Sequence, residues 1–310
     1  MPSPQLLRWI PILFVLLWAT GFIGAKYALP YAEPFTVLAL RMYITLGVFL
    51  VLIRFYKPKW PSPQGALHSM LVGSLVHAAY LGGVFAAINA GMAAGLASLL
   101  VGLQPILTAL IAWVWMDNQV NKKQLAGLLL GICGVAMVLL LGKASSHALQ
   151  FSYVSLLFAL MALFGITIGT LFQKRFCAKI DLLTGTFYQY LANALIMSLL
   201  AYLFETREID WQPQFIAALL WLVFGLSLSA ILLLMLMIRE GEATKVAAYF
   251  YLTPPVTALI AWILFDERLT AWGVAGISLT AYGVYLVIRN PARIVKQSAQ
   301  EARLATRSQG

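Results

Sequence analysis

The side chains able to bind a solute or carry a proton are few in this chain, and three of them recur at a helical interval. Ser74, His77 and Tyr80 follow one another at steps of three residues inside an otherwise apolar stretch. Residues at that spacing share one face of a helix, so we predict a polar stripe that points inward and binds solute through His77 and Tyr80. His77 also suits proton transfer, and a hydrogen bond to a neighbouring helix is the structural alternative.

Two prolines occupy matching places in the chain, each after a polar residue, as Gln104-Pro105 and Thr253-Pro254. Because proline lacks an N–H and clashes with the preceding turn, it interrupts a helix and frees backbone carbonyl groups. At membrane depth such groups must be buried in protein or face a wet cavity. Tyr249 shares a helical stripe with Thr253. We therefore predict that Gln104, Tyr249 and Thr253 bind solute in a cavity shaped by Pro105 and Pro254, and kinks that only aid packing are the alternative.

Three further residues complete the predicted path. Arg41 is the charge that falls well inside an apolar run, and Lys26 lies near the end of the preceding run. Arg41 either anchors the structure through backbone carbonyls or attracts a solute carboxylate. Lys26 either gates the path or extends its ammonium to the membrane interface. Trp18 is predicted to be a cavity wall, although tryptophan more commonly anchors a helix at that interface.

The residue sets of common enzymes and ATP-driven pumps are missing. The sequence has no phosphate-binding glycine loop and no His-Glu-x-x-His or Gly-x-Ser-x-Gly motif. Cys133 and Cys177 provide neither a disulfide framework nor a metal site, so we expect no cofactor and no metal. All eleven acidic residues fall in predicted loops or span ends. Because a buried carboxylate commonly carries the proton in driven transporters, we expect facilitated diffusion or weak proton coupling through His77.

The elements that must position these residues are membrane-spanning helices. Hydrophobic residues make up 62% of the 310-residue chain and charged residues 10%, against about 25% charged in a soluble protein. A span needs roughly 20 apolar residues. The apolar runs predict ten spans, at residues 9–29, 35–54, 66–88, 94–115, 123–141, 153–172, 182–204, 214–238, 244–265 and 271–288.

The net charge of +10 is explained as a topology signal. Ten spans put both termini on one side of the membrane. With the termini in the cytoplasm, sixteen Lys and Arg residues lie on that side and four lie outside, namely Lys26, Lys143, Arg207 and Arg268. Because Lys and Arg are retained in cytoplasmic loops, we predict cytoplasmic termini. The basic tail 291–310 is expected to contact anionic membrane lipids and not nucleic acid, for which the chain has no motif.

An internal repeat relates the two parts of the chain. Thr108–Trp113 recurs unchanged as Thr257–Trp262. In the longer comparison, Gln104–Gly134 matches Thr253–Gly283 at twelve of 31 positions. A repeat of this length indicates that the second part of the chain duplicates the first.

The repeat divides the chain into a five-helix unit at 1–142, a second at 150–290, and the tail. Because five is odd, the second unit enters the membrane from the opposite face. The predicted fold is an all-α integral membrane protein of ten transmembrane helices in two inverted five-helix repeats, the organisation of many secondary transporters. A duplication kept only for packing is the alternative. Glycine pairs such as Gly127/Gly131 and Gly165/Gly169 allow close helix approach, within the chain or in a homodimer.

These features together resemble the EamA family of the drug/metabolite transporter superfamily. Each half has a proline-containing fourth span that runs into an acidic turn, followed by a fifth span with a Gly-x6-Gly pattern. The most specific segments are Pro254–Gly283, which includes Asp266-Glu267-Arg268-Leu269-Thr270, and Trp18-Ala19-Thr20-Gly21-Phe22 through Lys26 to Arg41. The first-half turn departs from the family, because position 118 is Asn where Glu is usual.

The resemblance implies a bacterial inner-membrane protein with a central cavity lined by spans one, three, four, six, eight and nine. It implies a secondary transporter that moves small organic solutes by alternating access, most often as an exporter of amino acids. Some members of the family import a vitamin-like solute such as riboflavin. A structural or signalling membrane protein without transport is the alternative from another class, and an enzyme is not expected because no catalytic set converges.

Overall fold

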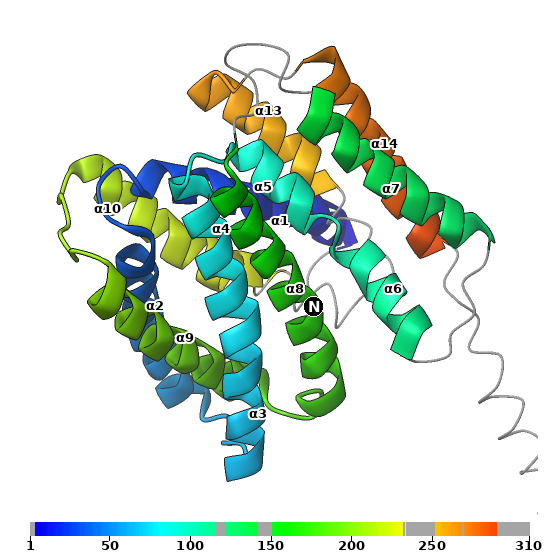
Figure 1. Ribbon diagram of the computed structural model, residues 1–310. Helices are drawn as coiled ribbons and strands as arrows, with labels where there is room; N and C mark the ends of the chain where they lie inside the picture. The colour runs from blue at the N-terminus through cyan, green and yellow to red at the C-terminus, as the bar shows by residue number, and fades with distance from the viewer. Residues whose placement is uncertain are drawn as a thin grey trace, which may run out of the picture.

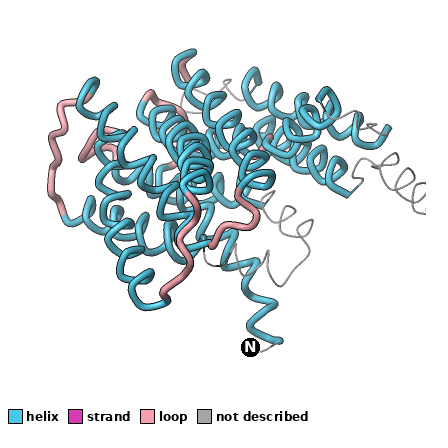
Figure 2. Tube along the Cα trace, turned by 90° about the horizontal axis from the view of Figure 1, so that it is seen from below, coloured by secondary structure: helices cyan, strands magenta, loops and turns pink. Residues whose placement is uncertain are grey.

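The computed structural model describes residues 4–115, 122–141, 151–231, 233, 252–267 and 270–289. Within these residues the chain is helical, with short loops and one isolated β-bridge between Ala32 and Ile209 (Figures 1 and 2). The described elements, in chain order, are α1 (Pro4–Ala28), α2 (Pro34–Tyr56), α3 (Pro63–Gly73), the π-helix η1 (Ser74–Ala79), α4 (Tyr80–Asn89), α5 (Ala94–Val101), α6 (Gln104–Trp115), α7 (Lys122–Leu141), α8 (Tyr153–Phe176), α9 (Leu182–Phe204), α10 (Pro213–Leu220), the π-helix η3 (Trp221–Ala230), α13 (Thr253–Phe265) and α14 (Ala271–Arg289).

Local sequence explains where these helices begin. Proline occupies the first positions of α2, α3, α10 and α13, where its missing N–H is not needed and its fixed φ suits a helix. Ser62, Ser152 and Asp181 cap α3, α8 and α9 by accepting hydrogen bonds from backbone N–H groups of the first turn. The helix starts are therefore determined by residues within a few positions of each boundary.

The apolar segments divide into long and short helices. Among the described residues, five segments are long and apolar enough to cross a membrane: Pro34–Tyr56, Pro63–Asn89, Tyr153–Gln173, Leu182–Phe204 and Pro213–Ala230. Shorter apolar helices occupy Ile12–Ala28, Ala94–Thr108, Leu125–Val138, Thr253–Phe265 and Ala271–Leu286. Each segment falls within or over one of the ten predicted spans, and side chains such as Leu50, Leu157 and Leu199 face outward.

Two stretches of wider helix interrupt the long segments. η1 joins α3 to α4, and η3 continues α10, so both occur inside a predicted span. The side chain of Ser229 in η3 donates to the carbonyl oxygen of Phe224, five residues earlier, at 2.7 Å. π-helical turns disturb the regular ladder of α-helical hydrogen bonds and frequently occur at functional sites. η1 and η3 are therefore candidate positions for a functional site.

Helices from the two halves of the chain pack against each other. α7 and α14 run side by side at one edge of the molecule and make the most extensive contact between described helices, while α2 packs on α9 and α4 packs on α8 (Figure 1). Glycines bring α7 and α14 close together, since a Cβ on Gly283 would lie 2.6 Å from the carbonyl oxygen of Gly127. The predicted close approach at Gly127/Gly131 therefore occurs within the chain.

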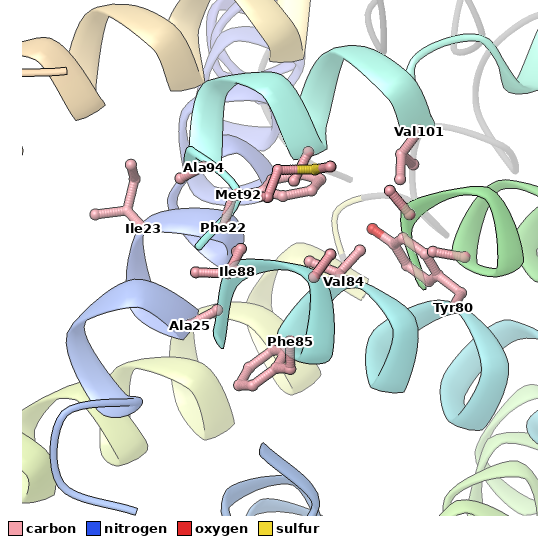
Figure 3. Close-up of a cluster of buried hydrophobic side chains, with 14 of the residues drawn as sticks. Phe22, Ile23, Ala25, Tyr80, Val84, Phe85, Ile88, Met92, Ala94 and Val101 are labelled. Atoms are coloured by element: carbon pink, nitrogen blue, oxygen red, sulfur yellow. The ribbon is translucent and has the colours of Figure 1, made fainter. Parts of the chain in front are cut away.

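The largest hydrophobic core lies where α1, α4 and α5 meet (Figure 3). Phe22 of α1, Phe85 of α4 and Leu99 of α5 are almost wholly buried. Figure 3 shows Tyr80 at the edge of this cluster, at the first residue of α4. The core thus holds the polar stripe of the third predicted span against its neighbours.

Candidate functional site

Arg41 connects α2 to η3 in the interior of the bundle. Its side chain is 5% exposed, and its Nε donates a hydrogen bond to Ser227 Oγ at 3.0 Å. The hydroxyl of Tyr190, on α9, donates to the carbonyl oxygen of the same Ser227 at 3.2 Å. One residue of η3 therefore receives hydrogen bonds from both α2 and α9, so elements of both halves meet here.

His77 lies on η1 and is also buried. Its Nε2 lies 3.3 Å from Gln189 Oε1 of α9, and its ring centroid is 4.7 Å from that of Tyr190. The structure thus has the hydrogen bond to a neighbouring helix that was the alternative to a solute or proton role. Because the Gln189 amide oxygen only accepts, Nε2 carries the hydrogen in this contact, and Nδ1 is the ring nitrogen through which His77 would take up a proton.

Tyr80 and Trp18 extend the same group of polar side chains toward α1. Tyr80 is 6% exposed, and a side-chain hydrogen bond joins it to Trp18. Arg41 lies within electrostatic range of His77, Tyr80 and Tyr190. We refer to Arg41, His77, Tyr80, Gln189, Tyr190 and Ser227 as the polar cluster. Of the sequence-predicted residues, it brings together Arg41, His77 and Tyr80, with Trp18 beside them.

The acidic residues are found at helix ends and in loops, as predicted, wherever the structure describes them. Glu267, just after α13, forms an ion pair with Lys26 of α1 and accepts hydrogen bonds from the backbone N–H groups of Ala94 (3.2 Å) and Gly95 (3.5 Å) at the start of α5. The Lys26 ammonium also lies 4.4 Å from the centroid of the Phe265 ring. Lys26 is therefore held at a junction of α1, α5 and α13.

Glu33 and Glu205 form a reciprocal connection nearby. Glu205 accepts hydrogen bonds from the N–H groups of Phe35 and Thr36 and from the Thr36 hydroxyl, each at 2.7 Å, at the start of α2. Glu33 accepts from the Thr206 N–H at 2.6 Å and hydroxyl at 2.7 Å. The Thr206 hydroxyl is the main reason that the pKa of the Glu33 carboxyl is below its ordinary value. We call Glu33, Glu205 and Glu267 the carboxylate clamps, and the end of the bundle that holds them the clamp end.

The matched prolines are placed differently from the rest of the predicted site. The fourth predicted span breaks at Gly102-Leu103, between α5 and α6, so Pro105 is the second residue of α6. Gly102 faces Pro254, and a Cβ at Gly102 would lie 2.9 Å from Pro254 Cγ. The two proline regions therefore meet at the helix break.

The polar residues before the prolines do not join the polar cluster. Gln104 Nε2 donates to Thr170 Oγ1 of α8 at 3.1 Å. Thr253 begins α13 and is buried, and its hydroxyl has no hydrogen-bond partner among the described residues. Tyr249 lies outside the described residues. Solute binding by these three residues stays a prediction.

Two apolar grooves open on the surface beside the π-helices. One, of about 740 Å³, is lined by Leu13 and Leu17 of α1 and by Trp221 and Phe224 of η3. The other, of about 600 Å³, is lined by Ser74 and Ala78 of η1, Met161 of α8 and Met197 of α9. Each groove thus adjoins one π-helix, one in each half of the chain.

Several residues of the site were missed by sequence reasoning. Gln189, Tyr190 and Ser227 lie in predicted spans seven and eight, and Asn193 lies one turn beyond Gln189. The four-residue spacing of Gln189 and Asn193 is a detectable polar stripe, of the same kind as Ser74-His77-Tyr80. The partners of Glu33, Glu205 and Glu267 carry no comparable signal, because they are mostly backbone N–H groups.

Comparisons with known proteins give matches over most of the chain. A sequence model described as the EamA-like transporter family matches residues 8–140 and 153–289. A Bacillus subtilis protein named "Uncharacterized transporter YvbV" is 27% identical over 282 residues, which is 88% of this chain and 88% of that protein. An Escherichia coli protein named "Probable amino-acid metabolite efflux pump" is 26% identical over 289 residues, covering 89% of this chain and 93% of that protein.

A solved crystal structure is similar in fold. It has a TM-score of 0.63 and 19% sequence identity, and the match covers 92% of this chain and 96% of that one. Similarity over nearly the full length of both chains shows that the helices share one overall arrangement.

Proposed function

Because the chain belongs to the EamA-like transporter family of the drug/metabolite transporter superfamily and is a multi-pass membrane protein, we propose that it exports small organic metabolites, such as amino acids, across the bacterial inner membrane by alternating access. The observation that carries the proposal is the polar cluster. It combines Arg41 and His77 from the first half with Tyr190 and Ser227 from the second, inside otherwise apolar helices. Polar side chains in such a position are costly and mark solute or ion pathways.

Helix pairing supports ten spans in two inverted repeats. Counted by predicted spans, the second packs on the seventh (α2 on α9), the fourth on the ninth (α5 on α13) and the fifth on the tenth (α7 on α14). The first packs on the eighth (α1 on η3), and the sixth packs on the third (α8 on η1 and α4). A two-fold axis that exchanges the halves would carry the second–seventh, fourth–ninth and fifth–tenth contacts onto themselves. It would carry the first–eighth contact onto the sixth–third contact, as two repeats related by such an axis require.

Loop contacts support the alternating direction of the spans. At the clamp end, Glu33 binds Thr206, so the loops after predicted spans one and seven meet. Glu267 binds the start of α5, so the loops after predicted spans nine and three meet at the same end. At the opposite end, the Thr184 hydroxyl donates to the carbonyl oxygen of Lys59 at 2.9 Å, so that the loops after spans two and six meet. With cytoplasmic termini, the clamp end faces the outside of the cell.

In this mechanism, the carboxylate clamps hold the outer end of the path closed. Glu267 ties α1 to α5 and α13 through Lys26 and two backbone N–H groups. Opening toward the outside separates these helices, and the π-helices η1 and η3 provide the bends. Lys26 is thereby a gate residue, while Pro105 and Pro254 shape the break beside the path.

Amino acids are the proposed solutes because the Escherichia coli relative, at 26% identity, is named a probable amino-acid metabolite efflux pump. The absence of acidic side chains from the described helix interiors supports facilitated diffusion or weak proton coupling. The basic tail 291–310 is proposed to contact anionic lipid.

Flux through the purified protein tests this function. The full chain is reconstituted in vesicles loaded with labelled amino acids, and efflux is followed with and without a proton gradient. We expect efflux to exceed that of protein-free vesicles and to depend only weakly on the gradient. Absence of flux for every solute would favour the structural alternative, while strong uphill accumulation that survives His77→Ala would refute the coupling mechanism.

A further inference from the structure

Arg41 is a buried cation without a counter-ion among the described residues. Within the described part of the chain, its guanidinium has one hydrogen bond, from Nε to Ser227 Oγ, and no carboxylate lies within ion-pair distance of it. The side chain is 5% exposed, and an arginine stays protonated in proteins. Burying an unpaired charge destabilises a protein strongly. Removing one partner of a buried ion pair is strongly destabilising for the same reason, because it leaves the other charge uncompensated. The missing negative charge must therefore come from outside the described side chains.

Ser227 leaves the terminal nitrogens of Arg41 available. A guanidinium binds a carboxylate best through two parallel N–H···O bonds. Because Nε is occupied by Ser227, the two Nη groups form the remaining fork. Tyr190 bonds the Ser227 carbonyl oxygen, so the acceptor that orients Arg41 is itself held in place.

A second buried polar group beside the cluster is also without a partner. Asn193 is fully buried, and neither its amide oxygen nor its amide nitrogen has a hydrogen-bond partner among the described residues. It lies on α9 midway between Gln189, which contacts His77, and Met197, which lies against Gly82. That spacing puts all three on one helical face, so Asn193 faces the η1 to α4 segment near His77. Leaving a buried amide without a partner is costly, so this position favours a ligand that completes its hydrogen bonds.

We propose that the polar cluster binds the carboxylate of the transported solute, with Arg41 as its cationic partner and Asn193 as a hydrogen-bonding residue for the neighbouring part of the solute. This inference rests on the proposed transport function and narrows its substrate class to organic acids and amino acids. A neutral planar solute of the vitamin kind would leave the Arg41 charge unpaired. Arg41 is thus assigned the second of its two sequence-predicted roles, attraction of a solute carboxylate.

Matched solutes test the assignment. Vesicles containing the full chain are assayed for exchange of individual L-amino acids and of the corresponding carboxamides, which differ at the carboxylate. The wild type is expected to move the acids at least ~10-fold faster, because charge-assisted hydrogen bonds contribute about 1.5–3 kcal/mol. Arg41→Gln is expected to abolish that preference, Arg41→Lys to retain part of it, and Arg54→Gln, an exposed arginine on the same helix, to leave it unchanged.

Ligand-induced thermal stabilisation of the detergent-solubilised protein separates this proposal from the transport function. We expect the amino acids, and neither their amides nor chloride at equal ionic strength, to raise the melting temperature of the wild type and of Arg41→Lys but not of Arg41→Gln. If the wild type moves acids and amides equally well, transport stands and the carboxylate assignment is overturned. If no solute is moved but carboxylates still stabilise in an Arg41-dependent way, transport fails and the site stands. Stabilisation by chloride alone, or none at all, contradicts the site.

Discussion

The clamp end and the polar cluster handle charge in opposite ways. At the clamp end each of the three glutamates is matched by donors from another segment, and Glu205 alone accepts three hydrogen bonds at the start of α2. Among the described residues, Arg41 of the polar cluster has a single hydrogen bond, and the side chain of Asn193 beside the cluster has none. Satisfied charges hold elements together, whereas unsatisfied buried groups are places for a ligand. This difference is the basis for proposing that the clamp end closes the path and that the polar cluster receives the solute.

Removing a clamp should have the largest effect on stability. Glu205→Ala leaves two N–H groups of α2 and the Thr36 hydroxyl without their acceptor. We expect the free energy of unfolding to fall by about 2 kcal/mol, since loss of a helix cap and of charge-assisted hydrogen bonds both contribute. Thermal unfolding in detergent measures the change. Glu208→Ala, an exposed acid of the same loop, is the matched control, and equal melting temperatures for the two variants would refute a clamp role for Glu205.

Weakening the gate should change access more than stability. Glu267→Gln removes the ion pair with Lys26 but keeps an oxygen for the start of α5. In a background with Cys133→Ala and Cys177→Ala, we introduce Ala28→Cys at a fully buried position at the end of α1. A membrane-impermeant maleimide should label this cysteine about 10-fold faster after Glu267→Gln, which corresponds to about 1.4 kcal/mol in the opening equilibrium.

The control for that gate experiment is Glu208→Gln in the same cysteine background. Its labelling rate should match that of the parent protein, because no hydrogen bond of the Glu208 side chain is recorded among the described residues. An unchanged rate in Glu267→Gln would show that the Lys26 pair does not hold the end closed.

Filling the unsatisfied position should separate stability from function. Asn193→Leu replaces an amide with an apolar group of similar size, so the free energy of unfolding is expected to rise by about 1 kcal/mol. Amino-acid flux in vesicles should nevertheless fall several-fold. If Asn193→Leu instead lowers the free energy of unfolding, the Asn193 amide already has hydrogen-bond partners in the protein. If the flux is unchanged, Asn193 is not part of the solute site.

The smallest expected effect concerns pH at the clamp end. Because the pKa of Glu33 is lowered in the folded protein, its contribution to stability is present above the unfolded value and is lost as pH falls through the folded value. We compare the melting temperatures of the wild type and Glu33→Gln from pH 3 to pH 8. The difference should be below about 1 kcal/mol, as for other exposed ionic contacts, constant above pH 5, and absent at the acidic end. A difference that grows toward low pH would reverse the sign and contradict the contact.

Helix positions were largely predictable because they depend on local composition. The seventh span was predicted at 182–204, which are the bounds of α9, and the second at 35–54 lies within α2. The fourth span was expected to run from 94 to 115 with a kink at Pro105, but the helix breaks at Gly102-Leu103. The break falls before the proline because Pro105 offers no N–H to the preceding turn, so the disturbance is N-terminal to it.

The site was only partly predictable. A polar stripe in the sequence shows which face of a helix is buried, but it does not show which residues of other helices contact that face. The stripe containing His77 and Tyr80 was correctly placed in the interior. Its partner Gln189 lies 112 residues away in the sequence, and no periodicity links the two. Lys26 was expected to reach the membrane interface or to gate the path, and its pairing with Glu267 spans 241 residues.

By itself, the sequence determined that this protein is helical, apolar and duplicated, because composition, helical spacing and repetition are properties of short stretches of chain. Those same properties identified the family. The tertiary structure decided which charges are satisfied. Glu267 has Lys26 and the start of α5, whereas Arg41 has Ser227 and no acid among the described residues. Such pairing depends on which helices lie side by side, and burial then makes the presence or absence of a partner energetically important.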